Sequence, residues 1–203
     1  MLLFSAGCSD KKEQKKAIPA KACAAPEEKN CTAGHTQNNA ELAAMLESAT
    51  ILKSVKDETH GILVYDNHFI IHDAKQPILL LNFFSTWCPP CRGQIPYFED
   101  LQKKYPKALF IAGILVNDDI NATALKRFYE TYHIHYFVSN DSENAYVAEK
   151  VSEALKLDAN FTLPLTVLYR NGKYYTHYEG PVPVEMIDHD IRMALEEKST
   201  PKK

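Results

Sequence analysis

The sequence predicts an α/β fold in which helices cover both faces of a mixed sheet. Two short, continuously apolar runs, 78–84 and 109–116, are typical of strands buried on both faces. Near the end of the chain, 165–170 and 173–178 flank Asn171-Gly172, the strongest short signal for an antiparallel hairpin. Helical segments alternate with the earlier strands, so the order is βαβα followed by ββα. Such an order combines parallel and antiparallel pairs in one sheet.

Apolar periodicity, turn residues and caps justify the separate elements. Asn39 is a suitable N-cap for a first helix, and Asp66-Asn67 suits a tight turn between two short strands. Pro96 lies inside an expected helix and kinks it, and Pro183 opens the last helix. In order, the expected elements are a helix over 39–54, strands over 61–65, 68–72 and 78–84, a helix over 90–105, a strand over 109–116, a helix over 121–132, a short strand or extended link over 136–138, a helix over 143–157, strands over 165–170 and 173–178, and a helix from 183.

The composition is that of one globular domain with a tail. The chain has 203 residues, of which 45% are hydrophobic and 24% charged. The net charge of −3 gives no reason to expect nucleic-acid binding or a basic membrane surface. Residues 9–38 are rich in Lys, Glu, Ala, Gln and Asn, so we expect a flexible tether there. The predicted division is a truncated signal and tether over 1–38 and a domain over 39–203, with its core at about 59–198.

The five cysteines fall into three groups. Ser5-Ala6-Gly7-Cys8 resembles the bacterial lipobox, in which small residues precede a cysteine that is acylated, and this predicts lipidation of Cys8. The sequence departs from that motif at Ser5, where Leu is usual, and in its short apolar stretch. An incidental cysteine in a disordered N-terminus is therefore the alternative. Cys23 and Cys31 in the tether could pair with each other, stay free or pair between chains.

The residues Trp87-Cys88-Pro89-Pro90-Cys91 follow the apolar run 78–84. Where a strand leads into a helix, the first sulfur lies at the helix N-terminus, and the dipole and free N–H groups there favour a thiolate. A thiolate is the species that attacks a disulfide. Zinc is the alternative, but it needs further ligands, usually from a second CxxC, and the sequence has no second CxxC. We therefore expect a redox dithiol, no metal, and no cofactor besides the Cys88–Cys91 disulfide.

Five spaced features of the chain belong together: the passage 80–92 from the strand into the CxxC, Pro96 inside the helix, Leu163-Pro164 before the strand 165–170, Asn171-Gly172-Lys173 at the turn, and Gly180 after the last strand. By these features the chain resembles, from about Thr59 to Lys198, thioredoxin-fold proteins, and more closely their membrane-tethered extracytoplasmic branch, the TlpA/ResA/DsbE-like thiol–disulfide oxidoreductases. This resemblance implies a thioredoxin fold preceded by a flexible tail, a helix and a β-hairpin, an enzyme that exchanges thiols and disulfides, and a cis-proline loop at Leu163-Pro164.

The resemblance gives roles to the residues around the dithiol. Cys88, at the exposed end of the helix, is expected to be the attacking nucleophile, and Cys91, one turn further in and more buried, the resolving thiol. Trp87 is expected to belong to the docking face, with core packing as the alternative. Pro164, after Leu163, lets the neighbouring backbone pair with a substrate strand if its peptide bond is cis. An ordinary trans turn is the alternative for that bond.

Two pairs of residues modify these expectations. Pro89 and Pro90 remove two backbone donors that could stabilise the first thiolate, which favours a reducing couple. Asn82 stands where thioredoxins carry a buried Asp, and Gln94 where ResA-like members carry a Glu. Amides form hydrogen bonds but do not titrate, so we expect slower proton transfer or a narrower partner set. Water or Glu99 could substitute as proton acceptor, although a solvated position on the helix face is the simpler interpretation of Glu99.

The eight histidines offer the other possible chemistry. His133 and His135 share one face if that segment is extended, and His68 and His72 could lie near each other. A Sco-like copper site uses two cysteines with three residues between them, whereas the spacing here is two. We therefore expect surface or hydrogen-bonded histidines.

Together these features predict a lipid-anchored, periplasmic or otherwise extracytoplasmic thiol–disulfide oxidoreductase on a bacterial membrane, acting as a reductant. The resemblance implies protein substrates, among them apocytochrome c or other disulfide proteins, and a membrane electron donor of the DsbD/CcdA type. An oxidase or isomerase resembling DsbA or DsbC is the alternative within the same class. A copper-binding chaperone that uses the dithiol as a ligand is the alternative from another class.

Overall fold

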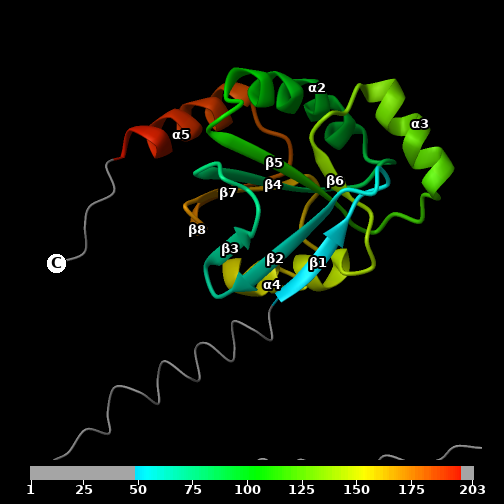
Figure 1. Ribbon diagram of the computed structural model, residues 1–203, viewed down its shortest axis with the longest axis horizontal. Helices are drawn as coiled ribbons and strands as arrows, with labels where there is room; N and C mark the ends of the chain where they lie inside the picture. Colours follow the sequence, from blue (N-terminus) through cyan, green and yellow to red (C-terminus); the bar gives the residue numbers. More distant parts are fainter. Residues whose placement is uncertain (1–48, 198–203) are drawn as a thin grey trace, which may run out of the picture.

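The computed structural model describes residues 49–197; the expected tether with Cys8, Cys23 and Cys31, and the start of the expected first helix, lie outside the described residues. Eight strands form one sheet in the order β1-β2-β3-β8-β7-β4-β5-β6, with α2, α3 and α5 on one face and α4 on the other (Figure 1). The predicted α/β class with a mixed sheet is therefore confirmed. The elements are β1 (Ala49–Lys53), β2 (Thr59–Tyr65), β3 (His68–Ile71), β4 (Ile78–Phe84), α2 (Pro89–Lys104), β5 (Leu109–Leu115), α3 (Ala122–Tyr132), β6 (Phe137–Ser139), α4 (Asn144–Leu155), β7 (Leu165–Arg170), β8 (Lys173–Glu179) and α5 (Val184–Glu196).

Strand β4 lies at the centre of the core, because every one of its side chains is buried. It pairs in parallel with β5 and antiparallel with β7. Leu80 and Phe84 pack in the cluster beneath α2, whereas Leu81 and Phe83 belong to the cluster that α4 covers. Asn82 shares the face of Leu80 and Phe84, since side chains two residues apart point to the same side of a strand. The amide of Asn82 therefore faces the helix that begins at the dithiol.

The N-terminal hairpin corrects one prediction. A helix was expected over 39–54, but 49–53 form β1, which pairs antiparallel with β2 from Ala49↔Leu63 to Lys53↔Thr59. Leu52 is buried and Ile51 is 61% exposed, an alternation that suits a strand over the core. The pairing with β2 overrides the apparent helical spacing, because a β-branched pair, Thr50-Ile51, fits a pleated edge better than a helix.

The end of β1 also contacts the far end of the sheet. Asn140 N donates to Lys53 O at 3.1 Å, and an isolated antiparallel bridge joins Ser54 to Ser139. These contacts bring the end of β1 to β6, the strand at the opposite end of the sheet order. Side chains of β1 and β2 and those of α4 share one buried cluster, so α4 packs against the hairpin on the same face of the sheet (Figure 1).

The remaining predicted elements are present with small shifts at their ends. The short strand predicted at 136–138 is found at 137–139, and Pro96 lies inside α2 as expected. Asn171 and Gly172 form the predicted β7–β8 turn with φ of 49° and 77°. A Cβ on Gly172 would lie 2.8 Å from the Ile70 side chain, so this turn needs glycine for space as well as for conformation. Over 49–197 no helix is long and apolar enough to span a bilayer.

Candidate active site

The two motif cysteines form a disulfide at the start of α2. Their Cα atoms are 5.3 Å apart, and the strand–helix connection makes Cys88 the N-cap, with extended backbone angles. The Cys91 backbone N–H donates to Cys88 Sγ at 3.3 Å. This is the geometry in which a helix N-terminus stabilises negative charge on the first sulfur once the disulfide is reduced.

The burial of the pair corrects another expectation. Cys88 was expected at an exposed helix end and Cys91 deeper, but they are 4% and 3% exposed. Because the disulfide turns Cys88 Sγ back toward the Cys91 N–H, both residues belong to the core cluster beneath α2. In the oxidised form burial does not show which cysteine is the nucleophile and which the resolving thiol. The assignment of Cys88 as nucleophile therefore rests on its position at the N-terminus of α2.

Pro89 and Pro90 occupy the first two positions of α2, which begins one residue earlier than predicted. They supply no N–H, so the first donor of the helix is Cys91 N, which reaches Cys88 Sγ, and the next is Arg92 N, which donates to Cys88 O at 3.1 Å. The first turn contains no acidic residue. The sulfur of Cys88 therefore accepts one backbone hydrogen bond from this helix end.

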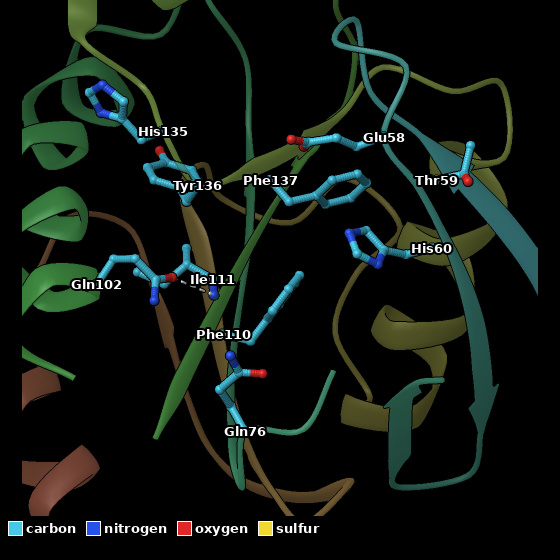
Figure 2. A pocket seen from close by; sticks show the side chains of 10 residues that line it. All are labelled: Glu58, Thr59, His60, Gln76, Gln102, Phe110, Ile111, His135, Tyr136 and Phe137. Atoms are coloured by element: carbon cyan, nitrogen blue, oxygen red, sulfur yellow. Dashed lines mark hydrogen bonds between the residues drawn. The ribbon is translucent and has the colours of Figure 1, made fainter. Parts of the chain in front are cut away.

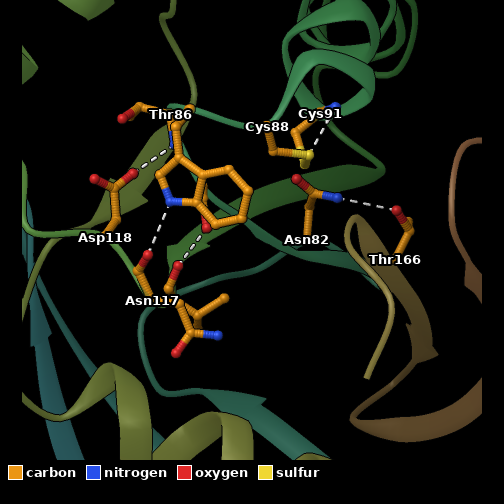
Figure 3. Close-up of a disulfide and its surroundings, with 10 residues drawn as sticks. Asn82, Thr86, Cys88, Cys91, Asn117, Asp118 and Thr166 are labelled. Carbon is orange, nitrogen blue, oxygen red and sulfur yellow. Dashed lines mark hydrogen bonds between the residues drawn. A yellow bond between two sulfur atoms is a disulfide. The ribbon is translucent and has the colours of Figure 1, made fainter. Parts of the chain in front are cut away.

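Trp87 lies on the surface beside the disulfide, with 61% of the residue exposed, so the alternative of core packing is wrong. Its indole Nε1 donates to Asn117 O at 2.9 Å, and the neighbouring Thr86 N donates to Asp118 Oδ2 at 2.5 Å (Figure 3). Asn117 has a left-handed φ of 51°, and Asp118 also accepts from Ile120 N at 3.2 Å. The β5–α3 connection thus fixes the segment before the dithiol, a relationship that the sequence analysis missed.

Asn82 lies directly beneath the disulfide, and its partner is a residue that the sequence analysis also missed (Figure 3). Asn82 Nδ2 donates to Thr166 Oγ1 at 3.0 Å, and the two residues are 4% and 0% exposed. They are directly opposite each other in the antiparallel β4–β7 pair. The pattern of β7 gave no sign of this contact, because a buried threonine is an ordinary strand residue until the register is known.

Gln94 is buried on α2, one turn beyond Cys91. Its Nε2 lies 3.5 Å from Val182 O in the β8–α5 connection, and its Oε1 has no hydrogen-bond partner among the described residues. The two amides expected near the dithiol are therefore both buried. The nitrogen of Asn82 donates one hydrogen bond, to Thr166, whereas Gln94 is only weakly held.

The loop before β7 carries the expected proline. The Leu163–Pro164 peptide bond is cis, Pro164 is buried, and Leu163 packs against both core clusters. Gly180 N donates to Pro164 O at 2.8 Å, with φ of 78° at Gly180. The alternative of a trans turn is wrong.

Glu99 is not a solvated helix-face residue. It is 6% exposed, and its Oε1 accepts from the backbone N–H groups of His135 and Tyr136 at 2.6 and 3.3 Å, while its Oε2 lies 3.0 Å from His135 Nδ1. It lies eight residues after Cys91, about 12 Å along the helix axis. Glu99 therefore holds the α3–β6 connection onto α2 and is too far along the helix to take a proton from Cys91 directly.

The histidines do not assemble a metal site in the described part of the chain. His133 ends α3 in a left-handed conformation, so the segment from His133 to His135 is not extended and does not place both rings on one face. His68 stacks on Tyr65, with the ring centroids 4.7 Å apart. Among residues 49–197 no group of three His, Cys, Asp or Glu side chains could hold a metal ion.

A cavity of about 540 Å³ lies at the other end of the parallel strands (Figure 2). Its lining includes His60, Phe110, His135 and Phe137, from β2 and from the beginnings of β5 and β6. The disulfide follows the carboxyl end of β4, which runs parallel to β5, so the cavity and the dithiol lie at opposite ends of the sheet. The cavity is therefore not part of the thiol site.

Comparison with known proteins gives the family of this site. The redoxin family model matches residues 54–189. Among curated relatives, the chain is 28% identical over 123 residues to the thiol-disulfide oxidoreductase ResA of Bacillus thuringiensis subsp. konkukian, covering 60% of this chain and 66% of that one. It is 32% identical over 74 residues to the thioredoxin-like protein YneN of Bacillus subtilis, covering 36% of this chain and 44% of YneN. The chain thus spans less than two thirds of the length of each.

Solved structures agree on the fold. A thiol:disulfide interchange protein of the thioredoxin family from Chlorobium tepidum TLS superposes with a TM-score of 0.58 at 23% identity, covering 73% of this chain and 94% of that one. StoA from Bacillus subtilis superposes with a TM-score of 0.51 at 19% identity, covering 70% and 95%. With the disulfide at the N-terminus of α2 and the cis-proline loop before β7, these matches show that the chain has a thioredoxin-like fold and belongs to the redoxin family.

Proposed function

We propose that this protein is a thiol–disulfide oxidoreductase that reduces disulfides in protein clients through Cys88 and Cys91. The observation that carries the proposal is the Cys88–Cys91 disulfide at the N-cap of α2, where a backbone N–H already points at Cys88 Sγ. The redoxin family match and the names of the ResA relatives support it.

The exchange proceeds in two displacements. In the reduced protein the Cys88 thiolate attacks a client disulfide, forms a mixed disulfide and releases one client thiolate. The Cys91 thiolate then attacks Cys88 Sγ, which expels the second client thiolate and closes the Cys88–Cys91 disulfide. The client gains two electrons and the protein loses two, so a separate reductant must restore the dithiol before the next turn.

Proton transfer at Cys91 distinguishes this site. Asn82 and Gln94 are buried amides and cannot accept the thiol proton, whereas Glu99 is engaged elsewhere. The proton of Cys91 therefore leaves to water or to the departing client thiolate. We therefore expect thiol–disulfide exchange to be slow at low pH, and its rate to depend on how each client positions its disulfide at the site.

The reducing direction rests on the prolines. Pro89 and Pro90 leave Cys88 Sγ with a single backbone donor, so the thiolate is less stabilised than at an ordinary helix N-terminus. A reduced form that is less stabilised gives up electrons more readily. The alternative function, an oxidase or isomerase, would need a Cys88 thiolate that is more strongly stabilised.

For the cellular setting we propose an extracytoplasmic, lipid-anchored protein. The support is the lipobox-like Ser5-Ala6-Gly7-Cys8, which lies outside the described residues. The proposed clients are protein disulfides, with apocytochrome c among them, and the proposed donor is a membrane protein of the DsbD/CcdA type. These partners follow the family resemblance.

The deciding experiment is the reduction potential of the pair, measured by equilibration with glutathione in the full chain with Cys8, Cys23 and Cys31 replaced by Ser. A value near or below about −250 mV supports a reductant, and one above about −150 mV identifies an oxidant. The Cys88→Ser variant must lose insulin reduction completely. Stoichiometric copper in the purified wild type, absent from Cys88→Ser, would favour the copper chaperone instead.

A further inference from the structure

We propose that Thr166 is a positioning residue for the thiol chemistry: it binds the nitrogen of the Asn82 amide, so that the amide oxygen faces the cysteines and accepts a hydrogen bond from a thiol of the reduced pair. This inference deepens the proposed oxidoreductase function and rests on it. Asn82 is then an acceptor that cannot titrate, and Thr166, which does not touch the sulfurs, decides which end of the amide they meet.

The backbone places the two residues together. In the antiparallel β4–β7 pair, Asn82 is directly opposite Thr166, and both side chains lie on the face that α2 covers. Side chains directly opposite each other have Cβ atoms about 4.5–5.5 Å apart, close enough for a hydroxyl to reach an amide. The resulting Nδ2–Oγ1 distance is 3.0 Å, and both residues are shielded from water.

The orientation of the amide follows from this bond. An asparagine side chain has two N–H donors at one end and an acceptor oxygen at the other. With Nδ2 directed to Thr166, the oxygen points toward the disulfide (Figure 3). In the oxidised protein neither sulfur carries a proton for that oxygen. Reduction supplies an S–H donor, so the hydrogen bond forms only in the reduced state.

The orientation determines the acidity of the thiol. A hydrogen bond from the S–H group to oxygen stabilises the protonated form, and a donor turned toward the sulfur would stabilise the thiolate. Replacing Thr166 with Val keeps the shape of the side chain but removes the hydroxyl. Nothing then holds Nδ2 on the β7 side, and the buried amide gains by turning a donor toward the thiolate. Loss of the hydroxyl should therefore lower the pKa of the thiol beside Asn82.

The test uses the full chain with Cys8, Cys23 and Cys31 replaced by Ser. The rate of alkylation of each reduced cysteine by iodoacetamide is followed against pH in the wild type and in Thr166→Val, Thr166→Ala and Thr166→Ser. We expect Val and Ala to move the midpoint of one cysteine down by about one pH unit, and Ser to restore it. Thr176→Val, on the adjacent strand β8 and half-buried, is the matched control and should leave the curve in place.

A double-mutant cycle separates positioning from a general structural effect. In an Asn82→Leu background, which has no amide to orient, Thr166→Val should cause no further shift. An equal shift in that background, or an unmoved midpoint in folded Thr166→Val and Thr166→Ala, overturns the inference. Insulin reduction by the wild type is measured alongside. Its absence would count against the proposed function, whereas an active wild type with unmoved midpoints would count against the role of Thr166 alone.

Discussion

The indole Nε1 of Trp87 donates a hydrogen bond to the main-chain oxygen of Asn117, 2.9 Å away, although most of the Trp87 side chain faces solvent. One residue earlier, Thr86 N is held by the Asp118 carboxylate. The residues that precede Cys88 are thus bonded to a loop that follows the neighbouring parallel strand. An exposed aromatic side chain held in one orientation is suited to contact a client without losing much conformational freedom.

The first prediction concerns this loop. Asp118→Ala removes the acceptor for Thr86 N and Ile120 N, so we expect Trp87 to become more mobile and the kcat/KM of insulin reduction to fall roughly threefold to tenfold. Trp87 is the single tryptophan of the chain, so acrylamide quenching of its fluorescence reports this mobility directly. Asp118→Asn, which keeps an acceptor oxygen, is the control and should remain close to the wild type. Equal quenching in all three proteins would refute this role of Asp118.

The second prediction concerns the buried amides. Asn82→Asp and Gln94→Glu each introduce a buried carboxyl group, whose pKa is raised by desolvation. We expect a new inflection in the pH profile of disulfide reduction, between about pH 5 and pH 8, because a carboxylate can accept the proton of Cys91. The measurement is the second-order rate of client reduction across that range. Profiles that coincide with the wild type in both variants would show that proton transfer from Cys91 does not limit the rate.

The third prediction concerns Glu99. Glu99→Gln disrupts a buried carboxylate that accepts two backbone N–H groups and contacts His135, so we expect the free energy of unfolding to fall by about 1–3 kcal/mol. Because Glu99 lies about 12 Å along α2 from Cys91, the pH profile of thiol exchange should stay unchanged. Urea unfolding and the exchange assay together check both parts. A shifted pH profile of thiol exchange with an unchanged free energy of unfolding would instead identify Glu99 as a proton acceptor for Cys91.

The fourth prediction concerns the contact between α5 and α2. Burial raises the pKa of Asp188, but hydrogen bonds from Lys104 Nζ at 2.7 Å and Tyr105 OH at 2.8 Å outweigh that effect and lower it. A lowered pKa in the folded state gives stability that is present above the carboxyl's unfolded value, near pH 4, and is lost as the pH falls through the folded value. Asp188→Asn should therefore lower the Tm by roughly 2–4 °C at pH 7. The difference from the wild type should shrink below pH 4. A difference that stays constant from pH 7 to pH 3 would contradict the assignment.

The motif and the sheet could be predicted because short-range patterns determine them. Each of these signals lies within a few consecutive residues: the apolar run 78–84, the Asn171-Gly172 turn, and the spacing of Cys88 and Cys91. The helix assigned to 49–53 was wrong because partnership with β2, a long-range contact, decides the state of so short a segment.

The supporting residues of the site could not be predicted for a related reason. Thr166 meets Asn82 only through the β4–β7 register, and Asp118 meets Thr86 only because β4 and β5 end side by side. Glu99 was expected on a solvated helix face, yet its carboxylate accepts hydrogen bonds from backbone groups of a connection 36 residues away. Burial of a polar side chain depends on such distant partners, and no local pattern reports them.

The contact of Lys53 and Ser54 with β6 has a consequence for association. A terminal strand offers unpaired N–H and C=O groups that join readily with any extended chain, including a second copy of the same protein. At β6 the main chain of Lys53 already accepts from Asn140 N, and Ser54 bridges Ser139. The main chain of Lys53 and Ser54 therefore occupies the place beside Ser139 and Asn140 where an extended segment of a client could otherwise add to the sheet.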